Sequence, residues 1–246
     1  MTDSYELFYW PSIPGRGEPV RLALEEAGVA YVDVARRPEA DGGGVAAMLN
    51  LLRAPGIAPF APPFLRSGGL VIAQTANILL YLGPRHGLVP DDEASRLHAN
   101  QLQLTITDLF AEVHETHHPI GSGLYYEDQK PEALRRAELF VRERLPKYLP
   151  YFEHALDAGG PYLFGAEVSY VDLSLFQVLE GLRYAFPRAT ARIAPGLPRL
   201  VALGERVRAR PRIAAYLASP RRIPFNEDGI FRRYPELDPA QAKPQT

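Results

Sequence analysis

The most constraining feature of the sequence is residues 5 to 28, which predict one strand, a tight connection and one helix. Tyr5 to Trp10 is rich in the aromatic and apolar residues that favour strands. Two prolines and two glycines follow and end the strand. A helix then begins near Pro19, which the first turn tolerates, and ends at Gly28, which suits a C-terminal cap. Loop backbone and helix N-terminus therefore point at one spot, an arrangement that favours an anionic ligand.

The rest of the first 83 residues predicts a small α/β unit. A strand at Tyr31–Val34 completes a right-handed βαβ unit, so the first two strands should be parallel. Residues 35 to 63 look irregular apart from a helical turn or two near Val45–Arg53. The later elements expected are an antiparallel pair at Phe64–Leu65 and Leu70–Ala73, and a helix from Gln74 to Leu82 that Gly83 ends.

The pattern changes after a proline-containing linker at residues 84 to 90, because only helical periodicity follows it. Ser169 and Asp172 have the spacing of a capping box, and the nearly all-apolar run after them indicates a helix in the middle of a bundle. Disorder is expected from Pro235 onward. The helices expected are Glu93–His118, Pro131–Leu156 with a kink or break at Pro146 and Pro150, one from Ser169, Leu197–Arg210, and a short one to Leu217.

Composition excludes several classes of function. The chain has 246 residues and no cysteine, which rules out disulfides, zinc–thiolate sites and a protein thiol nucleophile. A net charge of −2 gives no sign of a nucleic-acid partner or a membrane surface. No signal peptide is evident, and the most apolar window is too short to span a membrane. A cytoplasmic protein is expected by default.

Three local matches, in order along residues 5 to 220, resemble the cytosolic glutathione S-transferases. Tyr9-Trp10, followed by Gly15-Arg16-Gly17-Glu18 and Arg21, resembles the opening of the tyrosine-type classes (alpha, mu, pi and sigma). Pro63-Phe64, followed by Gln74 to Leu79, resembles the family's cis-proline and its γ-glutamyl-binding segment. Tyr162 to Gly165, followed by Ser169 to Asp172, resembles the capped central helix of the second domain. Each match alone is weak, but their order and spacing make the resemblance specific.

The resemblance implies a thioredoxin-like α/β N-terminal domain followed by an all-α helical bundle domain. The expected boundaries are a glutathione-binding domain at 1–83, a linker at 84–90, a helical domain at 91–220 that forms the electrophile site, and a partly disordered C-terminal extension at 221–246. The implied protein is a cytoplasmic homodimer acting in detoxification, with glutathione as co-substrate and with no permanently bound cofactor or metal.

The implied chemistry is stabilisation of a thiolate. The glutathione thiol has a pKa of about 8.5 or somewhat above, so little thiolate exists at neutral pH. A hydroxyl that donates a hydrogen bond to the sulfur favours the anion. Tyr9 is the expected donor. Ser12 is the alternative, because Trp10-Pro11-Ser12 resembles the opening of the plant tau class, although the Gly-Arg-x-Glu spacing fits the tyrosine classes better.

Other positions carry over from the resemblance as binding residues. The implied contacts with glutathione come from Tyr9, Arg16, Arg53, Ala61, Pro62, Gln74 and Thr75. Asp108 is the candidate for reaching the partner's glutathione across the dimer, and Phe60 is the candidate aromatic key of the dimer. The electrophile pocket is expected at Pro11, Ile13, His114 and His117, with the stretch 224–234 beside them.

The sequence departs from the family pattern at the cis-proline. If Pro63 is the cis residue, the residue before it is Pro62, which has no N–H to pair with the ligand. If Pro62 is the cis residue, Ala61 supplies that N–H, and the sequence leaves both assignments open. Trp10 is the only tryptophan, so the one that often binds the glycyl end is missing. Weaker glutathione binding is therefore expected, and the alternative function is a transferase-like binding or scaffolding protein without catalysis.

His114-Glu115-Thr116-His117-His118 matches the letters of the H-E-x-x-H zinc-hydrolase motif. That chemistry requires two histidines on one helical face and a third ligand. Pro119 disfavours helix at His118, so a helix end that lines a cleft is the preferred interpretation.

Overall fold

The structure is a computed structural model, and it describes residues 5–56, 58–158 and 160–238. Its N-terminal half is built on one mixed sheet with the strand order β2-β1-β3-β4. β1 pairs parallel with β2, as the βαβ pattern predicts, while β3 pairs antiparallel with both β1 and β4. The strands are β1 Tyr5–Phe8, β2 Tyr31–Asp33, β3 Phe64–Ser67 and β4 Leu70–Ala73.

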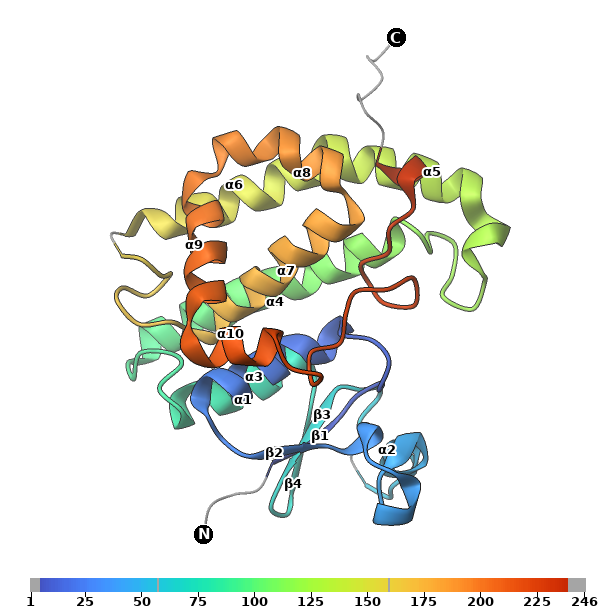
Figure 1. The fold of residues 1–246 in the computed structure, drawn as a ribbon, viewed down its shortest axis with the longest axis vertical. Coiled ribbons are helices and arrows are strands. Elements are labelled where there is room, and N and C mark those ends of the chain that lie inside the picture. The colour runs from blue at the N-terminus through green and yellow to red at the C-terminus, as the bar shows by residue number, and fades with distance from the viewer. Residues whose placement is uncertain (1–4, 57, 159, 239–246) are drawn as a thin grey trace.

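Helices cover both faces of this sheet (Figure 1). Tyr5 and Leu7 of β1 pack with apolar residues of α1 (Glu18–Ala27) and α3 (Thr75–Arg85) on one face. Phe8 alternates to the other face and packs with α2 (Gly44–Leu52). This alternation is the period of two that a strand imposes. The chain therefore has the thioredoxin-like N-terminal half that the sequence predicts.

The C-terminal half is helical and lies against the outer side of α1 and α3. Its central helix, α7, is buried along most of its length, as its apolar run predicts. Ser169 accepts from the Asp172 backbone N–H, and the Asp172 carboxylate accepts from the Ser169 N–H at 2.7 Å, so the capping box is formed. The helices are α4 Glu93–Glu115, α5 Lys130–Leu139, α6 Leu145–Ala155, α7 Tyr170–Ala185, α8 Pro187–Ile193, α9 Pro198–Ala209 and α10 Pro211–Leu217.

Gly83 does not end its helix, contrary to the prediction. α3 continues through Gly83 and Pro84 to Arg85, so the segment expected to be a linker begins inside the helix. A Cβ atom on Gly83 would lie 2.7 Å from Cδ1 of Tyr170 on α7. Gly83 is therefore required for the close approach of α3 to α7. Local sequence alone misread this glycine as a helix C-terminus.

Other boundaries also differ from expectation. α4 ends at Glu115 rather than at His118. Just after this end, the Thr116 hydroxyl donates to the Val113 carbonyl at 2.7 Å. The helix expected over residues 131 to 156 is interrupted by a π-helical turn at Phe140–Arg144, just before Pro146, where the kink or break is expected. α8 is missing from the prediction, because Phe186-Pro187 ends one helix and opens the next within two residues.

The residues after α10 form an extended segment that we call the C-terminal strap, residues 218–238. It runs from α10 past the N-terminal half toward α5 (Figure 1). The disorder expected from Pro235 onward is wrong for residues 235–238, the end of the strap, because Pro235–Leu237 forms a 3-10 turn and Asp238 is buried. Asp238 accepts from the Arg188 and Ala189 N–H groups at 2.6 and 3.0 Å and so caps α8. Residues 239–246 of the predicted tail lie outside the described residues.

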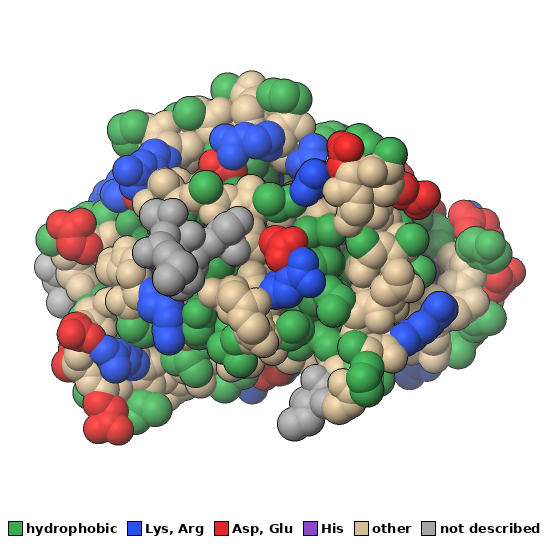
Figure 2. Space-filling model, turned by 90° about the horizontal axis from the view of Figure 1, so that it is seen from below, with side chains coloured by type: hydrophobic (Ala, Val, Ile, Leu, Met, Phe, Trp, Pro, Cys, Tyr) green, Lys and Arg blue, Asp and Glu red, His purple; other side chains and the backbone are tan. Residues whose placement is uncertain are grey.

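The surface carries both charges intermixed. On the face shown in Figure 2, basic and acidic side chains alternate with hydrophobic ones, and neither sign gathers into a patch. Within the described ranges, no helix is long and apolar enough to cross a membrane.

Candidate functional site

Tyr9 lies directly after β1 and is buried, with 3% of its surface exposed. The Arg16 backbone N–H donates to its hydroxyl oxygen at 2.8 Å. Among the described residues, no protein group accepts the hydroxyl proton. Burial raises the pKa of the Tyr9 phenol, and the Arg16 N–H opposes that rise. The group is therefore a protonated phenol at neutral pH, with its proton available to a ligand.

Two glycines of the 3-10 turn η1 (Gly15–Gly17) form the surface on which Tyr9 rests. A Cβ atom on Gly15 would lie 2.1 Å from the Tyr9 hydroxyl oxygen, and one on Gly17 would lie 2.6 Å from the ring. Gly15 also has a φ of +41°, in the left-handed region that favours glycine. The Gly-Arg-Gly sequence is therefore needed for the ring and the turn to approach so closely.

The same turn is joined to the N-terminus of α3. The Thr75 hydroxyl donates to the Arg16 carbonyl at 2.8 Å, so Arg16 connects Thr75 to Tyr9 through its two backbone groups. Thr75 does not cap its own helix, since the N-cap residue is Gln74. Gln74 is exposed and has a φ of +72°, the only positive φ of a non-glycine residue in the described chain. Such backbone strain recurs at ligand-binding positions, where the surrounding structure holds it in place.

A buried ionic network supports η1 from beneath. The Arg21 guanidinium is fully buried, pairs with Glu18 and Asp33 at 3.2 and 2.8 Å, and lies 5.7 Å from the Tyr9 ring centre. The carboxylates of Glu18 and Asp33 raise the pKa of Arg21 far above the usual range. The Arg21 charge in turn partly offsets the rise in the Tyr9 pKa that burial causes. Glu18 also accepts from the Tyr216 hydroxyl at 2.7 Å. The two halves of the chain therefore share one charge network beside the candidate site.

The remaining candidates for glutathione binding are less closely connected. The Pro62–Pro63 peptide bond is cis, so Pro63 is the cis-proline and Pro62, without an N–H, precedes it. The Pro63 carbonyl accepts from the Gln74 N–H at 3.3 Å. Ala61 is exposed, and Arg53 is exposed at the end of α2. Arg16 is half-buried, and within the described ranges its guanidinium has no ion pair, which leaves its charge available for a ligand.

The expected electrophile pocket is bordered by the C-terminal strap. Asn226 donates to the Ser12 carbonyl at 2.8 Å, and Gly229 lies beside Ile13. Pro11 is half-buried and Ser12 is exposed. These contacts bring the strap over the loop that follows Tyr9, as the expectation for residues 224–234 requires.

His114 and His117 lie together at the end of α4, and His118 joins them. The three ring centres lie 4.7 to 5.1 Å apart. His117 Nε2 is 2.8 Å from the Ile230 carbonyl of the strap. Burial lowers the pKa of His114 to about 4 and that of His117 to about 3, and the charges of Arg16 and Arg232 act in the same direction. Sequence reasoning named His118 only as part of the H-E-x-x-H letters and set it aside, and it missed Ile230, which nothing local indicated.

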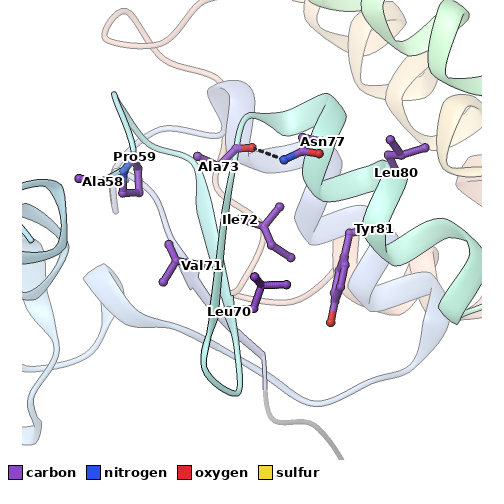
Figure 3. A pocket seen from close by; sticks show the side chains of 9 residues that line it. All are labelled: Ala58, Pro59, Leu70, Val71, Ile72, Ala73, Asn77, Leu80 and Tyr81. Atoms are coloured by element: carbon purple, nitrogen blue, oxygen red, sulfur yellow. Dashed lines mark hydrogen bonds between the residues drawn. The ribbon is translucent and has the colours of Figure 1, made fainter. Parts of the chain in front are cut away.

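A second surface feature is an apolar groove between β4 and α3, shown in Figure 3. Leu70, Ile72 and Tyr81 point toward one another across it. Phe60, in the loop before β3, is 94% exposed. Asp108 is exposed on α4.

The fold and the sequence agree with known proteins over most of the chain. The family model described as "Glutathione S-transferase, C-terminal domain" matches residues 114–220. The chain is 28% identical over 223 residues to "Glutathione S-transferase P 1" of Xenopus laevis, covering 89% of this chain and 93% of that protein. The chain is similar to glutathione S-transferases in sequence over most of its length, and residues 114–220 match the C-terminal domain of that family.

Solved structures of glutathione S-transferases share this fold. The pi-class enzyme of Onchocerca volvulus superposes with a TM-score of 0.66 at 23% identity, covering 88% of this chain and 92% of that one. The enzyme of Ascaris lumbricoides gives a TM-score of 0.65 at 25% identity, covering 87% and 96%. The predicted fold class, thioredoxin-like followed by all-helical, is confirmed.

Proposed function

We propose that the chain is a glutathione transferase that holds the glutathione sulfur as a thiolate against Tyr9 and directs it at a hydrophobic electrophile. One observation carries the assignment of Tyr9. Its hydroxyl oxygen accepts from the Arg16 N–H, and its proton has no acceptor within the described residues. A hydroxyl oriented in this way is a ready donor to an anion.

The energy required of this donor is modest. Lowering the thiol pKa by two units takes about 2.7 kcal/mol, which is within the range of a hydrogen bond to a charged acceptor. The raised pKa of the buried phenol keeps its proton on oxygen at neutral pH, so Tyr9 donates rather than ionises. The Arg16 N–H further polarises the hydroxyl toward the sulfur.

The N-terminus of α3 supports binding of the γ-glutamyl carboxylate. The unpaired backbone N–H groups and the dipole of a helix N-terminus favour an anion there. Thr75 ties this end of the helix to η1, so the carboxylate site and Tyr9 are held by the same backbone. The unpaired Arg16 guanidinium adds a positive charge beside them.

The test is an ultraviolet difference titration of bound glutathione across pH. Tyr9→Phe keeps the ring and removes the donor, and Ser12→Ala is the matched control on the same loop. We expect a thiolate at neutral pH in the native protein and in Ser12→Ala, and roughly tenfold to a hundredfold less in Tyr9→Phe. A thiolate lost only in Ser12→Ala would transfer the role to Ser12. No glutathione binding at all would favour a non-catalytic scaffold.

We further propose that the protein acts as a homodimer through the groove between β4 and α3. Leu70, Val71 and Leu80 are exposed around it, and Leu97 and Leu104 are exposed on α4. These apolar residues form two sets, one on β4 and α3 and one on α4, so a two-fold contact would cover both sets at once. In this arrangement Phe60 inserts into the partner as the aromatic key, and Asp108 reaches the partner's glutathione amine.

A further inference from the structure

We propose that His114, His117 and His118 form a binding site for a divalent transition-metal ion such as Zn²⁺. Their candidate ligand nitrogens all lie within 4.8 Å of one another, and they are the only such group of histidines and carboxylates within the described ranges. This proposal departs from the expectation, drawn from the family resemblance, that the chain holds no metal.

The chain geometry explains why the three rings converge. α4 ends at Glu115, and the His117 and His118 N–H groups both donate back to the His114 carbonyl at 3.3 and 3.1 Å. This tight turn folds the last two histidines back beside the first. The His114 and His118 rings stack with an interplanar angle of 26°, while His117 stands nearly perpendicular to His118 at 88°.

His117 is already held in the tautomer that a metal ligand needs. Its Nε2 lies 2.8 Å from the Ile230 carbonyl, which can only accept, so the proton is on Nε2 and Nδ1 is unprotonated, with its lone pair toward His118. A backbone carbonyl that receives the second ring nitrogen is a usual partner of a metal-bound histidine. His117 is also buried, so the ring is fixed by packing before any ion arrives.

The unprotonated Nδ1 of His117 accepts from Nδ1 of His118 at 2.5 Å, closer than an ordinary N–H···N hydrogen bond, and an ion would replace that shared proton. Two imidazole nitrogens bound to one tetrahedral zinc lie about 3.3 Å apart, given zinc–nitrogen bonds of about 2.0–2.1 Å. Separating these two rings by less than about 1 Å, and drawing in the His114 nitrogen, which lies within 4.8 Å of the other two, therefore admits the ion. Three imidazole nitrogens suit zinc, copper or nickel, and leave a fourth position open.

The surrounding charges both help and oppose the ion. Arg16 and Arg232 lie close enough to act on the rings and repel a cation, whereas Glu127 acts on His118 in the opposite sense. Arg232 thus provides a variant with an opposite expected effect.

The site is not a hydrolase site, despite the H-E-x-x-H letters. Glu115 is exposed, and its carboxylate pairs with Arg136 at 2.8 Å. His118 lies beyond the helix on which that motif depends. We therefore propose ion binding at the junction of α4 and the C-terminal strap, with no hydrolytic reaction.

The experiment is a Zn²⁺ titration of the untagged full chain by calorimetry, without glutathione because glutathione itself binds zinc. Cobalt absorption spectra on the same samples report the coordination geometry. The variants are His114→Gln and His118→Gln, with His98→Gln as the matched control, because His98 is exposed on the same helix. Circular dichroism checks that each variant is folded. Since the titration needs no glutathione, its result is independent of the proposed transferase function.

We expect one ion per chain in the native protein and in His98→Gln, with tetrahedral cobalt spectra. Removing either ligand should weaken binding roughly tenfold or more. Arg232→Gln should raise the zinc affinity, because it removes a positive charge that repels the ion. If the three histidines do not bind zinc and only hydrogen-bond to one another, this substitution would not change the zinc affinity. Equal affinity in His98→Gln and both ligand variants would overturn the proposal, as would the absence of binding to the native chain at millimolar zinc.

Discussion

Replacing Gly17 with alanine tests whether the η1 turn sets the position of Tyr9. Gly17 has a φ of −77° and a ψ of −25°, which alanine adopts without strain, so the substitution adds only a methyl group. That methyl would lie 2.6 Å from Cγ and Cδ1 of Tyr9 and 3.0 Å from its Cβ. These atoms are near the root of the side chain, so rotation about χ2 cannot relieve the clash.

The size of the effect follows from this geometry. A 2.6 Å approach is about 0.8 Å short of an ordinary van der Waals contact, so the ring must retreat by a comparable distance. The 2.8 Å hydrogen bond from the Arg16 N–H then stretches to about the limit of a hydrogen bond. We expect overpacking to cost about 1–3 kcal/mol of unfolding free energy. We also expect the bound thiol to lose roughly tenfold or more of its thiolate at neutral pH.

The assay pairs urea unfolding with the titration of bound glutathione. Gly69→Ala is the control, because a Cβ atom there would meet nothing within 4 Å. If Gly17→Ala keeps the native thiolate pKa while Tyr9→Phe raises it, the turn does not position Tyr9 and the reasoning fails.

Three further predictions concern the strap, the histidines and the dimer. Asp238→Ala removes the cap of α8 and should cost about 1–2 kcal/mol in urea unfolding, while Asp228→Ala, exposed on the same strap, should not. The pKa of His117 falls from 6.5 to about 3 on folding, so between these pH values the unfolded chain binds more protons than the folded one. The unfolding free energy should therefore drop as the pH falls from 6.5 toward 3. This drop should be smaller in His117→Gln than in the control His98→Gln. An unchanged slope in His117→Gln would remove His117 from this effect. Phe60→Ala should shift sedimentation toward the monomer, and a fully intact dimer would argue against Phe60 as the key.

The fold was predictable where local chemistry and tertiary packing agree. The Gly28 cap and the Ser169–Asp172 box follow from residues within a few positions of one another, and the parallel β1–β2 pair follows from the strand–helix–strand order of residues 5 to 34. Gly83 shows where this reasoning fails. Its role depends on Tyr170, which lies 87 positions further along the chain, and that contact is invisible to any local pattern.

The sequence names candidate residues for the site but does not reveal how they are connected. Tyr9, Arg16 and Thr75 were each expected to bind glutathione, and the structure brings them together through the Arg16 backbone. That linkage uses a main-chain N–H and C=O, which every non-proline residue carries, so no sequence pattern could reveal it. The Ile230 carbonyl beside His117 was hidden for the same reason.

The C-terminal strap has a consequence for the order in which the molecule is completed. It follows both halves along the chain, so it leaves the ribosome after the sheet and the helices α4 to α10 have emerged. Until it arrives, Ser12 lacks its contact with Asn226, His117 lacks the Ile230 carbonyl, and α8 lacks its cap. A nascent chain can therefore form its sheet and much of its helical core before residues 218–238 emerge, although Ile230, Phe231 and Leu237 of the strap complete that core. The candidate site becomes whole only once the strap has been made.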